Sequence, residues 1–192
     1  MLKIYFENRS KKTEEPFPVQ EGKTTIRRYE FKNRKDIGRI IVPEGITIIR
    51  EGAFMGCENL KDISLPNSLK VIEDRAFLGC QKLSSIKIPK NVRRIGQYAF
   101  HYCSNLEKVD IPEGVERIEK HAFTWCSGLK EVILPESIQM IDRTAFQKCD
   151  QLETIVIPDW FREQAIETFG DRKKKKKIIS SGDSMTMRNV AV

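Results

Sequence analysis

PNSLKVIEDRAFLGCQKLSSIKI, residues 66–88, is one copy of a 23-residue unit that repeats without insertion through most of the chain. The period shows in three residue types: prolines at Pro43, Pro66, Pro89, Pro112, Pro135 and Pro158, phenylalanines at Phe54, Phe77, Phe100, Phe123 and Phe146, and cysteines at Cys57, Cys80, Cys103, Cys126 and Cys149. A unit this short cannot bury its apolar face alone, so successive copies must stack. The repeat therefore predicts a solenoid, and we expect function on its outer faces rather than in a buried cleft.

Each unit divides into three short segments. The last segment, Leu83-x-x-Ile86-x-Ile88, alternates with a period of two, which is typical of a half-buried strand. The first, Leu69-x-x-Ile72, indicates a second short extended segment. Between them, Ala-Phe-x-x-Cys fits one helical or 3-10 turn with the Phe ring inside.

The unit resembles the BspA-like leucine-rich repeat family, whose copies combine proline, a V/I-x-x-I segment, G-x-x-A-F-x-x-C and L-x-x-I-x-I/L. EGITIIREGAFMGCENLKDISLP (44–66) and EGVERIEKHAFTWCSGLKEVILP (113–135) match at nearly every such position. The resemblance implies an α/β leucine-rich-repeat fold: a right-handed, β-rich solenoid of about seven turns, with short helical or 3-10 turns and a parallel strand ladder. It also implies adhesion and protein binding at cell surfaces.

The repeat phase predicts how the chain divides into segments. Residues 1–16 are expected to form an N-terminal strand followed by a charged loop. The solenoid covers 17–158, with a degenerate cap unit at 17–42 and five full repeats at 43–157. A polar Arg34 at the cysteine position of the cap unit suits an end that meets water.

The C-terminal segment, 159–180, is predicted to close the stack. Phe161, Ala165 and Phe169 are spaced as on one face of a helix, so we expect a capping helix at 159–170. Ile178 continues the column of Ile155, which predicts a basic edge strand at 174–180. Residues 181–192 carry no pattern and are expected to form a flexible tail.

The net charge of +7 is unevenly distributed. Residues 1–42 hold 11 Lys and Arg against 6 Asp and Glu, and residues 171–179 hold 6 against 1, so each end carries +5, whereas 43–170 holds 16 against 19. No apolar run is long enough for a transmembrane helix, and no signal-peptide core is present. We therefore expect a cytoplasmic protein, or a surface or secreted one if a leader was removed.

The residues that carry chemistry are few. All five cysteines share one repeat position, which favours free, buried structural thiols over disulfides or a zinc site, in keeping with a reducing compartment. With only two histidines, His101 and His121, and no free nucleophile beside them, we expect no enzyme, no metal and no cofactor. Gly22-Lys23-Thr24 lacks the earlier glycine of a phosphate-binding loop.

The basic run allows three interpretations. It consists of Arg172, Lys173, Lys174, Lys175, Lys176 and Lys177. Lysines on an edge strand prevent edge-to-edge association, which is the interpretation we favour and which predicts a monomer. The alternatives are contact with nucleic acid or another polyanion, and a targeting signal.

Aromatic residues and histidines gather in two adjacent copies at the Ala-Phe turn. These candidate partner-binding residues are Tyr98, His101, Tyr102, His121 and Trp125. Residues 23 apart should be neighbours about 5 Å apart, which pairs Tyr98 with His121 and Tyr102 with Trp125. Either the rings only pack on the solenoid wall, or they form a binding hot spot.

Three functions remain compatible with the sequence. The first is a non-catalytic protein-protein interaction module, a leucine-rich-repeat scaffold with an unknown protein partner. The second is a surface adhesin whose export signal is absent from this sequence. The third is a polyanion-binding protein that acts through its basic ends, in which binding should weaken steeply with salt.

Overall fold

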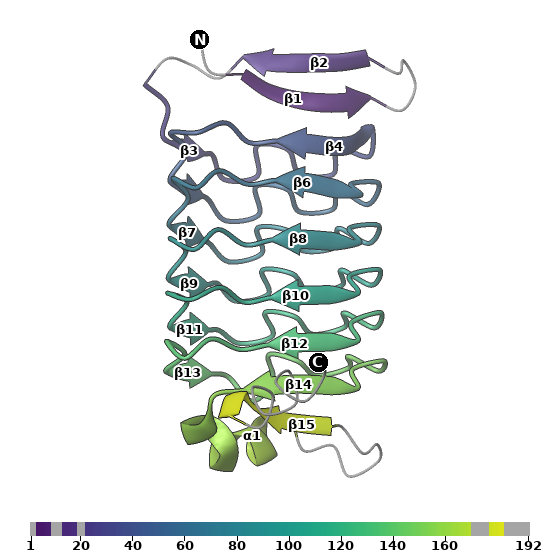
Figure 1. Ribbon diagram of the computed structural model, residues 1–192. Coiled ribbons are helices and arrows are strands. Elements are labelled where there is room, and N and C mark those ends of the chain that lie inside the picture. The colour runs from purple at the N-terminus through teal and green to yellow at the C-terminus, as the bar shows by residue number, and fades with distance from the viewer. Residues whose placement is uncertain (1–2, 9–12, 19–21, 170–176, 183–192) are drawn as a thin grey trace, which may run out of the picture.

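The computed structural model describes residues 3–8, 13–18, 22–169 and 177–182, with side chains from residue 22 onward. Its repeats stack into one elongated solenoid, with β1 (Lys3–Asn8) and β2 (Thr13–Pro18) at one end and α1 (Arg162–Phe169) and β15 (Lys177–Ser180) at the other (Figure 1). The longest helix of the described chain is the short α1 (Arg162–Phe169), and no described helix could cross a membrane.

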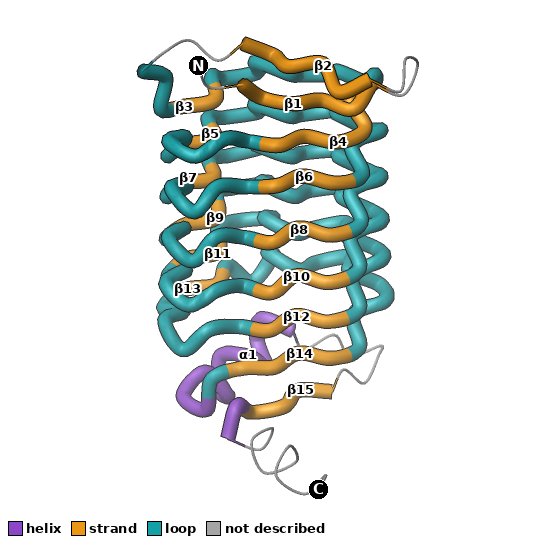
Figure 2. The backbone as a smooth tube through the Cα atoms, turned by 45° about the horizontal axis from the view of Figure 1, so that its top comes forward, coloured by secondary structure: helices purple, strands orange, loops and turns teal. Residues whose placement is uncertain are grey.

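Two parallel ladders of strands run along different walls of the solenoid (Figure 2). The long-strand ladder contains β4 (Ile37–Ile41), β6 (Asp62–Ser64), β8 (Ser85–Lys87), β10 (Lys108–Asp110), β12 (Glu131–Ile133), β14 (Thr154–Ile157) and β15 (Lys177–Ser180). The short-strand ladder contains β3 (Thr25–Ile26), β5 (Ile48–Ile49), β7 (Val71–Ile72), β9 (Arg94–Ile95), β11 (Arg117–Ile118) and β13 (Met140–Ile141). The leucine-rich-repeat solenoid predicted from the sequence is thereby confirmed.

Strand pairing follows the repeat. Each strand pairs with its copy 23 residues away, as Lys108 does with Glu131 and Arg117 with Met140. The long-strand ladder divides into two hydrogen-bonded sheets between β6 and β8, whereas the short-strand ladder is continuous. Six short strands make about six turns, one fewer than expected, because α1 takes the place of a seventh short strand before β15.

The Ala-Phe segment forms two consecutive turns rather than a helix. Hydrogen bonds of 3-10 type occur, such as those from the Leu78 N–H to the Arg75 carbonyl and from the Cys80 N–H to the Phe77 carbonyl, both 3.1 Å. Arg75 and Gly79, however, have positive φ angles of 57° and 75°. A left-handed residue ends helical propagation, so the segment makes single 3-10-type turns, as the sequence predicted, and does not extend into a longer helix.

The core is a ladder of phenylalanines flanked by cysteines. Rings from Phe31 to Phe146 stack with centroids 5.1–5.3 Å apart and interplanar angles of 2–9°. Every column cysteine is free and buried, and its thiol donates to a Phe carbonyl 26 residues earlier, as Cys57 does to Phe31 at 3.1 Å. The regular core holds the outer walls rigid.

The N-terminal end differs from the expected strand and charged loop. β1 (Lys3–Asn8) forms an antiparallel hairpin with β2 (Thr13–Pro18), and β1 also pairs antiparallel with β4. Residues 13–16 therefore form a strand where the sequence predicted a charged loop, and the first two residues of the predicted cap unit, 17 and 18, belong to the same strand. Pairing with β1 gives hydrogen-bond partners to backbone N–H and C=O groups that a loop would leave unpaired.

At the C-terminal end, η1 (Asp159–Phe161) and α1 cover the last turn, and Phe161, Ala165 and Phe169 are buried. β15 pairs parallel with β14. The predicted edge strand extends to residue 174, but 174–176 lie outside the described residues. Of the predicted tail, 183–192 lie outside them, while the Ser181 hydroxyl donates to Glu136 at 2.9 Å.

Candidate functional site

Left-handed backbone recurs in two columns of the repeat, on either side of the Ala-Phe pair. The first column holds Tyr29, Gly52, Arg75, Tyr98 and His121, and the second holds Asn33, Gly56, Gly79, Tyr102, Trp125 and Lys148. Glycine adopts this conformation without strain, whereas a side chain costs about 1–2 kcal/mol. The solenoid tolerates this strain because stacked neighbours on both sides determine the backbone.

The five sequence-predicted residues of the partner site come together as one cluster, which we call the aromatic ledge: Tyr98, His101, Tyr102, His121 and Trp125. Tyr102 and Trp125 stack with centroids 5.4 Å apart and planes 5° apart. Tyr98 and His121 lie 4.9 Å apart. Four of the five residues occupy left-handed positions on two adjacent turns.

His101 joins the two pairs. Its ring makes edge contacts with Tyr98 at 5.4 Å and Tyr102 at 4.8 Å. Its Nδ1 is buried without a hydrogen-bond partner among the described residues. Burial, with a smaller contribution from the nearby His121, lowers the pKa of His101 below its ordinary value, so the ring is neutral at pH 7.

The proton position on His121 follows from its neighbours. The Thr124 hydroxyl donates to the Thr144 carbonyl at 2.7 Å, which commits its single proton. His121 Nδ1 lies 3.1 Å from the same hydroxyl oxygen. We therefore assign the Nδ1–H tautomer to neutral His121, with Nε2 as the free acceptor.

Cations lie at both ends of the ledge. The Arg75 guanidinium is 5.7 Å from the Tyr98 ring centroid, and the Lys148 ammonium is 5.9 Å from that of Trp125. Both distances fall within the range of cation–π attraction. The ledge thus combines π faces with positive charge.

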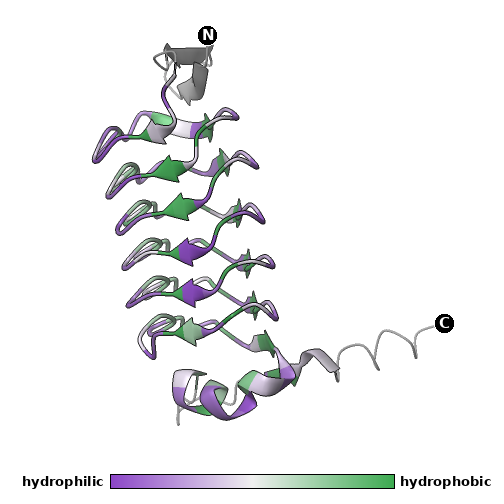
Figure 3. Cartoon of the chain, turned by 90° about the vertical axis from the view of Figure 1, so that its left-hand side faces the viewer, coloured by the Kyte–Doolittle hydropathy of each residue, from purple (hydrophilic) through white to green (hydrophobic). Residues whose placement is uncertain are grey.

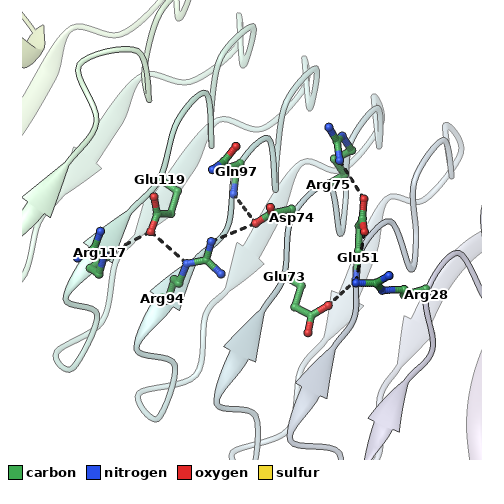
Figure 4. Close-up of polar contacts among 9 residues, drawn as sticks. All are labelled: Arg28, Glu51, Glu73, Asp74, Arg75, Arg94, Gln97, Arg117 and Glu119. Atoms are coloured by element: carbon green, nitrogen blue, oxygen red, sulfur yellow. Dashed lines mark hydrogen bonds and ion pairs between the residues drawn. The ribbon is translucent and has the colours of Figure 1, made fainter.

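An ion-pair network borders the first column (Figure 4). Arg75 pairs with Glu51 of the preceding turn at 2.9 Å, and Arg94 bridges Asp74 at 3.2 Å and Glu119 at 3.1 Å. These pairs join successive repeats. Because exposed pairs each contribute only about 0–1 kcal/mol, the network orients the surface more than it stabilises the fold.

The short-strand wall beside this network changes character along the solenoid. It is apolar at β5 and β7 and hydrophilic at β9 and β11, where Arg94 and Arg117 lie (Figure 3). The Tyr29 hydroxyl donates to Glu51, and this bond, together with Arg75, lowers the pKa of that carboxyl. Glu51 therefore stays ionised, and it neutralises part of the charge of Arg75.

Only one residue of the basic run lies within the described part of the chain. Lys177 begins β15 and is exposed. Arg172 and the lysines at 173–176 lie outside the described residues, so Lys177 alone represents the run on the described surface.

The thiols are poor candidates for chemistry. Burial raises the pKa of Cys57 and Cys103 to about 12, and that of Cys80 and Cys126 well above the ordinary value. At these four cysteines the nucleophilic thiolate is therefore scarce at neutral pH. Within the described residues, no group of three or more His, Cys, Asp or Glu side chains could hold a metal ion.

Sequence reasoning located the ring pairs from the 23-residue spacing but missed their backbone strain and flanking cations. Both features depend on the direction in which the turn projects its side chains. The sequence did contain a clue to the backbone conformation, since other repeats carry Gly52, Gly56 and Gly79 at the ring positions, and glycine there indicates a left-handed backbone.

Comparison of the sequence with protein-family models identifies the family of this chain. The sequence model for the family described as the BspA type leucine rich repeat region matches residues 24–153 and 94–190, with six copies. No curated protein matches the chain.

Three solved structures illustrate the likeness in fold. A T. pallidum leucine rich repeat protein, TpLRR, is 24% identical with a TM-score of 0.63 over 86% of this chain and 85% of its own. A leucine-rich repeat protein from Bacteroides ovatus is 23% identical, with a TM-score of 0.57, over 83% and 58%. The pneumococcal vaccine antigen PcpA is 20% identical, with a TM-score of 0.69, over 86% and 41%. At these identities the likeness shows the fold alone.

Proposed function

The chain belongs to the BspA-type leucine-rich repeat family, and we propose on that basis that it is a non-catalytic scaffold that binds a protein partner through the aromatic ledge. Repeat solenoids present extended surfaces suited to binding. Both the family and the fold are those of leucine-rich repeat proteins, which supports a binding scaffold.

The observation that carries this proposal is the backbone conformation of the ledge. Tyr98, Tyr102, His121 and Trp125 have φ angles of 56–63°, at positions where other copies carry glycine. Each ring imposes strain of about 1–2 kcal/mol that glycine would avoid. Strained residues that persist in a cluster support a functional hypothesis better than exposed rings alone do.

Exposure and rigidity add support. Tyr102 is 45% exposed and Trp125 is 38% exposed, although both stack. Rings held by stacking lose little rotamer freedom on binding, and Tyr and Trp dominate binding hot spots for this reason. A partner therefore meets a surface that is already ordered.

Replacing Tyr102 and Trp125 together by glycine tests the proposal. Wild-type and variant proteins serve as bait in extracts of the native cell, with captured proteins quantified by mass spectrometry. We expect loss of the captured partner with little change in melting temperature, because glycine removes strain of about the same size as the stacking energy it sacrifices, about 1 kcal/mol per ring.

Trp160→Ala provides the matched control. Trp160 is 48% exposed but lies on the C-terminal cap, away from the ledge. This variant should keep the partner. Capture that survives in the double glycine variant, or that is lost equally in the Trp160 variant, would rule out the ledge as the binding site.

A further inference from the structure

We propose that His101 is a pH-sensitive switch for the aromatic ledge: on taking up a proton its ring rotates out from between Tyr98 and Tyr102, and the ledge changes from a closed to an open form. The closed form binds the partner at neutral pH, and the open form releases it in acid. This inference rests on the proposed scaffold function and specifies how the same site is regulated. The opening itself is a property of this chain alone, so it can be measured without the partner.

The His101 ring connects the two ring pairs of the ledge. Its edge contacts with Tyr98 and Tyr102 have interplanar angles of 80° and 81°. Tyr98 contacts His121 in turn, and Tyr102 stacks on Trp125. If the His101 ring rotates away, both tyrosines lose a neighbour, and the five side chains no longer form one ordered surface.

The neutral ring fits this place, whereas the charged ring does not. The Nδ1 atom of His101 is buried, and no group in the described part of the chain bonds to it. A neutral imidazole can carry its single proton on Nε2, which leaves only a lone pair at Nδ1. An imidazolium carries a proton on each nitrogen, so it adds a buried N–H without an acceptor and a charge removed from water. Rotation into solvent relieves both costs.

The backbone allows the side chain to move alone. The His101 N–H donates to the Tyr98 carbonyl at 3.2 Å, and the His101 carbonyl accepts the Gly79 N–H at 2.7 Å. These bonds hold the turn in place while the side chain rotates about its own torsions. The ring is half-buried, so it already borders water on one side. The switch therefore needs a rotamer change and no unfolding of the repeat.

The titratable groups that face His101 supply no negative charge near neutral pH. They are the phenols of Tyr98 and Tyr102 on its own turn, the guanidinium of Arg75 on the preceding turn, and His121 and Lys120 on the following turn. Positive charge on His121 opposes a second positive charge on His101.

The carboxylates of the adjoining turns are bound to other groups. Asp74 and Glu119 both pair with Arg94. One turn further along, Asp142 accepts hydrogen bonds from the Thr144 hydroxyl and N–H. These bonds commit the carboxylates that could otherwise stabilise an imidazolium at position 101.

The direction of the switch follows from these surroundings. Burial, with a smaller contribution from His121, lowers the pKa of His101 in the closed ledge below the ordinary 6.5. A ring that has rotated into water regains the ordinary value. Acid therefore favours the open ledge as pH falls through 6.5 toward the lower pKa of the closed form. Because the partner binds the closed form, the proton and the partner compete.

Nuclear magnetic resonance of the labelled protein tests the opening directly. Nuclear Overhauser contacts of the His101 ring with the Tyr98 and Tyr102 rings should be present at pH 7.5 and absent at pH 5. Contacts between the core rings of Phe100 and Phe123, whose centroids are 5.1 Å apart, should persist at both pH values. Their persistence distinguishes a local opening from unfolding.

His121→Asn tests the surroundings of the switch. Asparagine tolerates the φ angle of 56° at this position. The chain has two histidines, so the one imidazole resonance left in this variant belongs to His101. Its titration midpoint should lie higher than in wild type, because the charge of His121 opposes protonation of His101.

The functional consequence is measured on the partner captured from native cell extract. Protein captured at pH 7.5 by wild type and by His101→Leu is washed at pH 7.5 or at pH 5, and the retained amounts are compared within each protein. Leucine occupies the equivalent position one turn earlier and cannot take up a proton. We expect wild type to retain up to about tenfold less at pH 5, because only the closed fraction binds. His101→Leu should retain similar amounts at both pH values.

Contacts of His101 with both tyrosines that persist at pH 5 would overturn the inference, as would a midpoint that His121→Asn leaves unchanged or lowers. Equal release in acid from wild type and His101→Leu would also overturn it, because titration of the partner would then explain the release. Retention by wild type at pH 5 has the same consequence. Absence of any captured partner at pH 7.5 would instead refute the scaffold function, and the resonance measurements then decide whether the ledge opens.

Discussion

At the scale of single residues, one backbone position decides which side chains the solenoid can display. The second left-handed column accepts Asn33, Gly56, Gly79, Tyr102, Trp125 and Lys148 with φ angles between 58° and 75°. Stacked turns fix this geometry whatever residue is present. The identity of the side chain is therefore free to vary for binding, at the cost of local strain.

His101 should lower the stability of the fold. Its buried Nδ1 lacks a hydrogen-bond partner among the described residues, and the equivalent position one turn earlier holds Leu78. We expect His101→Leu to raise the free energy of unfolding at pH 7.5 by about 1 kcal/mol, because an unpaired buried polar atom costs about that much. Urea denaturation measures the change, and a less stable variant would contradict it.

The same substitution should change the response to acid. Burial, with a smaller effect of His121, lowers the folded-state pKa of His101 below the ordinary 6.5. The unfolded state then binds the proton first, so wild type loses stability as pH falls through 6.5 toward the lower folded-state pKa. His101→Leu lacks this loss. Urea denaturation between pH 7.5 and 5 should show that the free energy of unfolding declines less steeply for the variant than for wild type. Equal declines would contradict a lowered pKa of His101 in the folded state.

At the scale of secondary-structure elements, the two ends of the long-strand ladder close differently. At the N-terminal end, β1 and β2 add antiparallel strands, and Pro16 and Pro18 on β2 offer no N–H for further pairing. At the C-terminal end, η1 and α1 cover the core before β15 pairs with β14. Solenoids need such ends because the last repeat would otherwise expose its core.

Phe169 should be the main anchor of the C-terminal cap. It is 3% exposed, and its ring lies 5.3 Å from that of Phe146. Phe169→Ala should lower the free energy of unfolding by about 3 kcal/mol, the usual cost of emptying a buried ring site. Ile166→Ala, on the same helix but 67% exposed, should change it by less than about 0.5 kcal/mol. Equal shifts in thermal or urea denaturation would show that α1 does not seal the core.

At the scale of the whole molecule, charge separates the ends from the body. Each end carries +5, whereas the 43–170 body is mildly acidic. β15 pairs with β14 on one side only, among the described residues. Exposed edge strands recruit other chains unless charge prevents it, so we expect the lysine run to protect this edge.

Replacing Lys174, Lys175, Lys176 and Lys177 by threonine should therefore cause self-association. Threonine keeps strand propensity but removes the repulsion. Light scattering coupled to size-exclusion chromatography should find a monomeric wild type and a larger variant. As the control, Lys70→Thr and Lys120→Thr remove two lysines from the solenoid body and should leave a monomer. A monomeric lysine-run variant that loses salt-sensitive heparin binding would instead support the polyanion interpretation.

The sequence by itself determined the repeat, the buried Phe and Cys columns and the neighbours of Tyr98 and Tyr102. A strict 23-residue period places equivalent residues on adjacent turns, so local pattern and spatial contact carry the same information. It did not determine the β1–β2 hairpin, the left-handed backbone of the ledge or the cations over its rings. These features depend on strand pairing outside the repeat and on the direction in which each turn projects its side chains, so only the stacked tertiary structure decides them.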